Sequence, residues 1–490
     1  MSRGMKKSLC LFLALLVLGS ACLAGAHCVI NEKRDKVELT EHVVYGSPAA
    51  AEGLELKLHV TCNDRLFWDT AHTLGSDPET RTEFSFYQAQ KREEYEFEYG
   101  GMTVDIGSYF GMGFGGDAGA DDEILSEFHG YESVIKDVLS RAQPGEEHTE
   151  KVFLSDYMDY YPINFVMDTD AFISEGEDGY AFMTGDLRAD FPELDQWLND
   201  YFRIPVDERY AVTVTVLKTE DGNIREIDMA QDDDYWLSIS NPSVITEDAC
   251  YFALSIEDPD GSKLDASLIP GGFGVYRIPF SRKEEDGDEV KTAEIRELEN
   301  VYSISENEGI RDMKLSSDGE DVLLVTTEKD RSVLTVLDAE TAEKKQRIDI
   351  AETDWPSLYY HDGFVAACSE ERLVLMEKTP DGTYRRALDV DISGEDFIDG
   401  MNWRPYDMAW NGERLAIAVS RYVQKECYDS GSGQYYIAAD ETCGCWLAVY
   451  DAAGLLYCTD ITSSLTGDFE LSYDKKTRFI RSDPVEVEWK

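Results

Sequence analysis

The sequence predicts an all-β protein made of consecutive small antiparallel sheets, and a recurring hairpin signal is the main observation behind this prediction. Alternating apolar positions flank Asp-Gly or Asn-Gly at Asp318-Gly319, Asp362-Gly363 and Asn411-Gly412. These dipeptides favour the positive φ of tight hairpins, and period-2 alternation gives each strand one buried face. The signal recurs about every 45 residues with further strand segments between copies, which is typical of one four-stranded sheet per repeat. We therefore expect a β-propeller of roughly six to eight blades.

Further segments supply the remaining strands of each repeat. "VLTVLDAETAEKKQRIDI" and "LAVYDAAGLLYCTDI" occupy equivalent places as third and fourth strands, with Asp338 and Asp451 opening the turn between them. With "LSSDGEDVLLV", these segments resemble bacterial β-propeller repeat families of the WD and YVTN kind. The resemblance implies the fold alone, because its motifs are turn signatures that carry no catalytic residues.

Two helices are expected within this strand-rich sequence. Residues 121–142 place apolar side chains on one face at helical spacing and stop at Pro144-Gly145. Residues 192–202 begin with Pro192, which suits the first helical position. We expect a strand-rich region carrying these helices over 27–233, and propeller blades over 234–490 with a polar insertion at 421–444. An N-terminal β-sandwich followed by a smaller C-terminal propeller is the alternative that the pattern leaves open.

The first 26 residues have the pattern of a secretory signal peptide. Arg3, Lys6 and Lys7 precede the short apolar stretch Leu9–Leu18, and small residues at 24–26 form a cleavage site. The alternative is a lipid anchor on Cys22, within a degenerate lipobox. No other segment is apolar over the length that a membrane span requires. We expect a secreted protein, or one on the extracytoplasmic face of a bacterial envelope.

The chain is strongly acidic. It carries 99 Asp and Glu against 45 Lys and Arg, for a formal net charge of -54. A negative field of this size repels nucleic acid and anionic lipid, so both classes of partner are disfavoured. The same charge keeps a protein soluble, and we expect a monomer whose partner is a protein or a carbohydrate.

Eight cysteines follow the signal peptide, and an even number permits disulfides in an exported chain. The local candidate is a bridge from Cys427 to Cys443 or Cys445 across the polar insertion. Metal ligation by the same three residues is the alternative, although zinc ligands usually come as CxxC pairs. Cys250 and Cys368 lie in apolar strands and are expected to be buried thiols or structural bridges.

A cluster of carboxylates indicates a calcium site. Calcium selects carboxylate oxygens, although the spacing does not match an EF-hand, and a solvated hairpin tip is the alternative. No other cofactor is predicted to be required. The cluster consists of Asp168, Asp170, Glu175, Glu177 and Asp178.

Aromatic residues beside carboxylates indicate a candidate ligand site in "LSDYMDYYPINF". Aromatic faces suit stacking on sugars, and carboxylates accept hydrogen bonds from hydroxyls. Ordinary packing of Tyr in a sheet is the alternative. The candidate residues are Tyr157, Asp159, Tyr160 and Tyr161.

No catalytic motif is complete. The chain contains no GxSxG elbow, HExxH, P-loop or CxxC, and 99 acids offer no means of selecting a glycosidase pair from spacing. The sequence therefore predicts an exported, non-enzymatic β-propeller that binds a protein or carbohydrate ligand. Two alternatives remain: an extracellular hydrolase or lyase acting on carbohydrate, and a scaffold subunit of envelope assembly.

Overall fold

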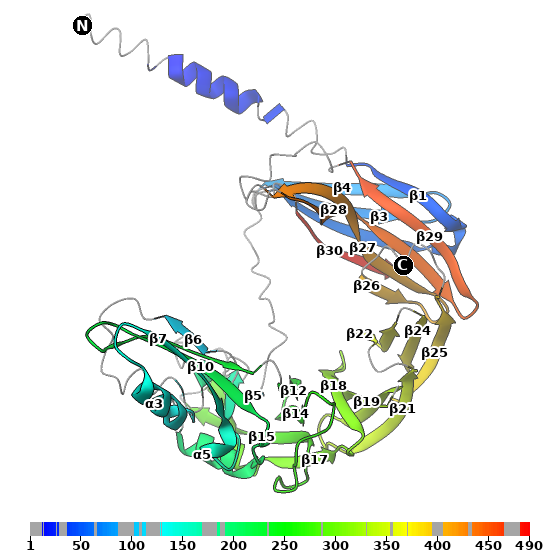
Figure 1. Cartoon of the computed structure of the whole chain (residues 1–490). Helices are drawn as coiled ribbons and strands as arrows, with labels where there is room; N and C mark the ends of the chain where they lie inside the picture. Colours follow the sequence, from blue (N-terminus) through cyan, green and yellow to red (C-terminus); the bar gives the residue numbers. More distant parts are fainter. Residues whose placement is uncertain are drawn as a thin grey trace, which may run out of the picture. The chain divides into compact units, whose positions relative to one another are not determined.

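The chain folds into two compact units in the computed structural model (Figure 1). Unit 1 comprises Met1–Glu93, Ala366–Glu377 and Arg386–Lys490, and unit 2 comprises Glu94–Val365 and Lys378–Arg385. The structure describes residues 12, 14–25, 27–28, 37–62, 66–86, 102–106, 110–113, 128, 130–168, 184–186, 192–232, 235–285, 288–329, 331–352, 356–369, 371–393, 405–429, 434–464 and 481–490. Residues 14–25, in the expected signal peptide, are helical. Within these ranges no helix is long and apolar enough to cross a membrane.

The described residues of unit 1 contain two complete antiparallel sheets. The first has the order β30-β2-β3-β4, with β2 Leu54–Cys62, β3 Leu66–Thr73, β4 Glu79–Phe86 and β30 Arg481–Trp489. The second has the order β1-β29-β28-β27-β26, with β1 Leu39–Gly46, β26 Pro405–Trp410, β27 Leu415–Asp429, β28 Gln434–Asp451 and β29 Gly454–Ser463. A 3₁₀ turn, η1 Pro48–Ala51, joins β1 to β2.

Each sheet of unit 1 is completed by a strand from the opposite end of the chain. The early strand β1 pairs with β29, and the final strand β30 pairs with β2. Buried residues from both sheets, among them Leu56, Leu447 and Val485, form one hydrophobic core. The early strands therefore do not form a separate N-terminal β-sandwich, because they depend on C-terminal strands for their sheet neighbours.

In its described ranges, unit 2 contains four antiparallel sheets. The regular one, β18-β19-β20-β21, consists of β18 Glu308–Leu315, β19 Asp321–Glu328, β20 Arg331–Asp338 and β21 Lys344–Ala351. The preceding sheet contains β12 Ser238–Ser240, β13 Ser243–Ile245, β14 Ala249–Glu257, β15 Gly274–Glu285, β16 Asp288–Ala293 and β17 Glu299–Ser303. The third sheet has the order β6-β11-β10-β7, with β6 Phe110–Gly113, β7 Glu147–Phe153, β10 Ala211–Lys218 and β11 Ile224–Gln231. The fourth has the order β5-β8-β9, with β5 Met102–Ile106, β8 Ile163–Asp168 and β9 Thr184–Asp186.

A seventh sheet has the order β22-β23-β24-β25, and the division between the units runs through its strands. It consists of β22 Ser357–His361, β23 Phe364–Cys368, β24 Arg372–Lys378 and β25 Tyr384–Asp391. Its topology repeats that of β18–β21, as expected for successive blades. The described residues thus form an all-β protein of propeller-type sheets, which confirms the predicted fold class.

The predicted glycine corners are the turns of these repeats. Gly319 joins β18 to β19, Gly363 joins β22 to β23 and Gly412 joins β26 to β27. Their φ angles are +74°, +78° and +94°, a region that glycine enters without the steric cost that a Cβ brings. The sequence signal therefore identified the first hairpin of three consecutive repeats.

The two expected helices are present, and one is shorter than expected. α5 spans Pro192–Tyr201, in agreement with the sequence pattern. α3 spans only Glu132–Arg141, whereas the apolar spacing suggested a start at residue 121. The left-handed Gly130, with φ +81°, prevents the helix from continuing upstream of Tyr131. Residues 121–127 lie outside the described ranges.

The structure shows which elements contain the expected domain boundary and the expected insertion. The division between residues 233 and 234 falls within unit 2, between β11 and β12. The insertion at 421–444 is largely strand, because β27 and β28 continue past their sheet neighbours and pair from Tyr422↔Glu441 to Asp429↔Gln434.

Candidate functional site

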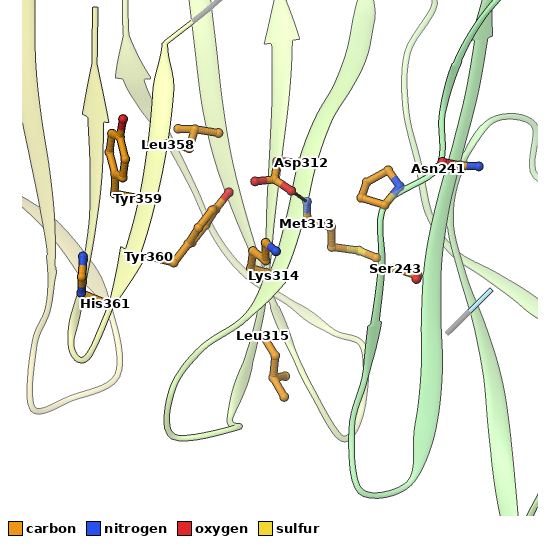
Figure 2. Close-up of a pocket in the computed structure, with 11 residues that line it drawn as sticks. Asn241, Ser243, Asp312, Met313, Lys314, Leu315, Leu358, Tyr359, Tyr360 and His361 are labelled. Atoms are coloured by element: carbon orange, nitrogen blue, oxygen red, sulfur yellow. Dashed lines mark hydrogen bonds between the residues drawn. The ribbon is translucent and has the colours of Figure 1, made fainter. Parts of the chain in front are cut away.

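A pocket of about 590 Å³ lies along the edge strands of three successive sheets. β13 and β18 contact each other directly, and β22 is the edge strand of the next sheet along the chain. All of the lining residues belong to unit 2. They are Asn241, Pro242, Ser243, Asp312, Met313, Lys314, Leu315, Leu358, Tyr359, Tyr360 and His361 (Figure 2).

The sequence of β18 explains how polar groups reach this pocket. Met313 is buried, while its neighbours Asp312 and Lys314 are half-buried, as strand alternation requires. The register of β18 against β19 shifts between Ile310 and Asp312. A bulge of this kind redirects a side chain locally, and here it precedes the one acidic residue that lines the pocket.

Asp312 and Tyr360 form the electrostatic centre of the pocket. Their side chains point toward one another from β18 and β22 (Figure 2). One carboxylate oxygen of Asp312 accepts a hydrogen bond from the backbone N–H of Met313 at 2.8 Å. The Tyr360 hydroxyl is buried and has no partner at ordinary hydrogen-bond distance among the described residues. Burial raises the pKa of Tyr360 well above its usual value, and the nearby Asp312 carboxylate adds to this effect.

An equivalent aspartate in unit 1 shows what Asp312 contributes to structure. Asp407 on β26 also follows a register shift and also accepts the N–H of the next residue, Met408, at 2.8 Å. Its second oxygen accepts the N–H of Val487 on β30 at 2.8 Å. The aspartate at this position therefore links neighbouring sheets. Asp312 follows the equivalent register shift in β18, but its side chain faces the pocket and the Tyr360 hydroxyl.

The other lining groups offer hydrogen bonds and aromatic faces. Asn241 and Ser243 line one wall, and Tyr359 and His361 line the opposite one. The His361 ring stacks on Phe364, with centroids 5.0 Å apart. A site with this composition can bind a polar, hydroxyl-bearing ligand by hydrogen bonds and stacking. In the part of the chain that the structure describes, no three His, Cys, Asp or Glu residues are grouped as metal ligands.

The tyrosines and aspartate predicted as a ligand site do not converge. The Tyr157 hydroxyl donates a hydrogen bond to Asp137 on α3. Tyr160 is 40% exposed and lies beneath the Arg203 guanidinium, 5.8 Å from the ring centroid. Tyr161 is 2% exposed, and its hydroxyl accepts the N–H of Asp207 at 3.1 Å. Asp159 is exposed, and its carbonyl accepts the N–H of Val206. These residues are close together in the sequence, but in the fold their side chains lie in separate surroundings.

The predicted calcium ligands lie mostly beyond the described residues. Asp168 is the last residue of β8. Asp170, Glu175, Glu177 and Asp178 lie outside the described ranges. The calcium site remains a prediction.

The proposed bridge between Cys427 and Cys443 does not fit the strand register. Cys427 on β27 is opposite Tyr436, so Cys443 lies seven positions farther along β28. At ~3.3 Å per residue this is ~23 Å, whereas disulfide-linked Cα atoms lie within about 7 Å. The register therefore holds the two cysteines apart.

Cys22, Cys28, Cys250, Cys368 and Cys445 are free thiols. Burial raises the pKa of both Cys250 and Cys368 to about 12. Burial also raises the pKa of Cys445, which packs in the core of unit 1. Cys22, the candidate lipidation site, is exposed on the N-terminal helix.

The pocket residues were not selected at the sequence level, although their signal was present. Eight of the eleven occupy the strands immediately before Gly319 and Gly363, that is, the first strand of a predicted hairpin. The repeat pattern located these strands. It did not indicate that their edges meet, because strand adjacency between sheets depends on tertiary packing.

Comparisons with known proteins find only distant similarity. No protein-family model and no curated protein matches the chain. A solved putative 6-phosphogluconolactonase from Bacteroides fragilis has 9% identity and a TM-score of 0.25, covering 80% of this chain and 97% of its own. A β-propeller domain from Myceliophteria thermophila has 11% identity and a TM-score of 0.21, covering 51% and 92%. The periplasmic gluconolactonase of Pseudomonas aeruginosa has 14% identity and a TM-score of 0.20, covering 47% and 77%.

Proposed function

We propose that this protein is an exported, non-enzymatic propeller-type binding protein that holds a carbohydrate ligand in the pocket between β13, β18 and β22. The observation that carries the proposal is the composition of this pocket. The Tyr360 hydroxyl of β22 points toward the Asp312 carboxylate of β18, and Tyr359, Asn241 and Ser243 also line the pocket. Its volume of about 590 Å³ lies within the usual range of ligand sites. The signal-peptide pattern of residues 1–26 supports export.

Binding without catalysis is the function that the pocket chemistry supports best. Glycoside hydrolysis requires two carboxyl groups at a defined separation, and among the described residues Asp312 is the one acid that lines this pocket. Lys314 lies beside Asp312 and adds a cationic group, which suits a ligand bearing an acidic as well as a neutral sugar.

The test is a titration of the full-length secreted protein with neutral and uronic-acid oligosaccharides, followed by calorimetry. Replacing Tyr359 by Ala removes an aromatic face from the pocket, and we expect affinity to fall about tenfold, equivalent to ~1.4 kcal/mol. Trp236 is 48% exposed and lines no part of the pocket, so Trp236→Ala is the matched control and should leave affinity unchanged.

Two outcomes would contradict the proposal. The first is an absence of binding across the whole panel. The second is an equal loss of affinity in both variants. Release of reducing ends by the wild-type protein would instead favour the hydrolase or lyase alternative.

A further inference from the structure

β1 is an open sheet edge with unusual composition. It pairs with β29 and has no second strand neighbour among the described residues. β1 lies beyond the last strand of its meander, as a fifth strand of the sheet (Figure 1). An open edge presents unpaired N–H and C=O groups, which can pair with an extended peptide.

The corresponding edge strands of four other sheets are protected by positive charge. Lysine and arginine on an edge discourage pairing with another chain. These residues are Arg81 on β4, Lys291 on β16, Lys344, Lys345 and Arg347 on β21, and Arg385 and Arg386 on β25. β1, with the sequence LTEHVVYG, contains no Lys, Arg or Pro. β1 therefore lacks the positive charge that these four edge strands carry.

The accessible edge is also apolar over three successive residues. Val43, Val44 and Tyr45 are 49%, 52% and 53% exposed. A register shift between Val43 and Tyr45 interrupts pairing with β29 there. Exposed apolar side chains beside an open edge offer an added strand both backbone partners and side-chain contact.

The ladder with β29 determines which backbone groups point outward. The N–H of Ser464 bonds to the carbonyl of Glu38, so these two residues form a hydrogen-bonded pair. Hydrogen-bonded and non-hydrogen-bonded pairs alternate in an antiparallel ladder. The N–H and C=O groups of Leu39, Glu41 and Val43 are consequently directed away from β29, toward the open edge.

Side-chain contacts with β3 and β29 hold β1 in place. Glu41 Oε1 lies 2.9 Å from His72 Nε2 on β3, and Glu41 Oε2 accepts the Tyr457 hydroxyl of β29 at 2.8 Å. His72 also contacts the Thr80 hydroxyl of β4 at 2.8 Å. An edge fixed before binding loses little conformational entropy when a strand is added.

The charge around β1 indicates the kind of segment that would be added. β1, β29 and β4 carry four acids against one base, and the whole chain has a net charge of -54. The four acids are Glu41, Asp460, Glu79 and Glu83, and the base is Arg81. A second copy of this chain brings the same negative field, whereas a basic segment is attracted.

We propose that β1 is a docking strand for a basic, extended segment of a partner protein, which adds to the sheet antiparallel or parallel to β1. The alternating outward N–H and C=O groups provide the affinity, and the acidic surroundings select a segment rich in Lys or Arg. This site lies in unit 1 and is separate from the pocket of unit 2.

The first experiment uses the full-length protein and a capped peptide as long as β1, with Lys and Val in alternation. We expect saturable binding, measured by fluorescence anisotropy, that weakens several-fold as NaCl approaches about 0.5 M. A peptide with Glu in place of Lys should bind at least tenfold more weakly. So should a Lys peptide whose alternate backbone amides are N-methylated, because it cannot donate to the edge. Equal binding of the N-methylated peptide would overturn the proposal.

A pair of protein variants provides the second experiment. Val43→Lys adds to β1 the charge that the edge strands β4, β16, β21 and β25 carry, and we expect peptide affinity to fall at least tenfold. Val166→Lys is the matched control, since Val166 is 36% exposed on β8, which has strand neighbours on both sides. Unchanged affinity in Val43→Lys would refute the docking strand. A wild-type dimer in sedimentation that dissociates in Val43→Lys would replace the basic partner by a second copy.

Discussion

Glu41 is a half-buried carboxylate whose charge is stabilised by the groups around it. Burial by itself would raise the pKa of Glu41, but hydrogen bonds from His72 and Tyr457 outweigh burial and lower it below 4.5. A carboxyl with a lowered pKa in the folded state stabilises the fold at pH values above its pKa in the unfolded chain. That stabilisation is lost as pH falls through the folded value. Glu41 thus contributes to stability at neutral pH and loses this contribution below about pH 4.5.

We predict that Tyr457→Phe lowers the free energy of unfolding by about 1.5–3 kcal/mol at pH 7, the usual range for a hydrogen bond to a charged group. The difference from wild type should shrink as pH falls below 4.5 and through the lowered pKa of Glu41 in the folded state, where this carboxyl becomes neutral. Urea unfolding at the two pH values measures this. Tyr45→Phe, on an exposed ring of the same sheet, is the control. An equal effect of both changes would show that the hydrogen bond to Glu41 is not responsible.

At the scale of the element, the glycine corners decide where each repeat turns. The corner at Gly319 is reinforced by Asp318, whose carboxylate accepts bonds from the Ser316 hydroxyl at 2.7 Å and from Lys378. Burial acts to raise the pKa of Asp318, but these bonds prevail and lower it to about 2. The Asp-Gly pair is therefore stabilised both by backbone conformation and by side-chain bonds.

We predict that Gly319→Ala destabilises the protein by about 1–2 kcal/mol, the cost of a left-handed residue with a side chain. No atom lies within 4 Å of an added Cβ, so strain in φ is the whole effect. Gly319→Asn should cost less, because Asn tolerates this region. Gly274→Ala should cost more, because its Cβ would lie 2.0 Å from the Tyr302 carbonyl oxygen. Thermal denaturation of the three variants gives the order of their destabilisation. A different order would contradict the role of φ at the corner.

At the scale of the whole molecule, the pairing of the terminal strands stabilises the fold, whereas the net charge destabilises it. The pairing of β1 with β29 and of β30 with β2 connects the two ends of the described chain within unit 1. A net charge of -54 acts against any compact state through self-repulsion. The core of unit 1, which includes residues from both terminal strands, offsets this repulsion.

We predict that raising NaCl from a few millimolar to about 0.5 M increases Tm by several degrees, because salt screens self-repulsion. Calorimetric scans at constant pH measure this shift. A fall in Tm with salt would indicate that attractive ion pairs outweigh the repulsion. If the predicted calcium site is occupied, CaCl₂ at matched ionic strength should raise Tm beyond the effect of NaCl and of MgCl₂.

Local patterns in the sequence were sufficient for the repeat architecture. Positive φ at Gly319, Gly363 and Gly412, and the start of α5 at Pro192, depend on one residue and its immediate neighbours. The start of α3 was predicted too early. The prediction followed the apolar spacing upstream of residue 132, whereas in the structure the left-handed conformation of Gly130 ends the helix there.

The candidate pocket and the open edge were decided by tertiary structure. Asp312 and Tyr360 are separated by 48 positions, and their approach depends on which sheets pack together. The aromatic and acidic cluster around Tyr157 was the stronger local signal, yet strand and helix packing dispersed it. Likewise, β1 became an open edge only because β29 was its partner. A turn is determined by the conformational limits of a few adjacent residues, whereas a site is determined by long-range contacts, and those contacts exist only once the sheets have assembled.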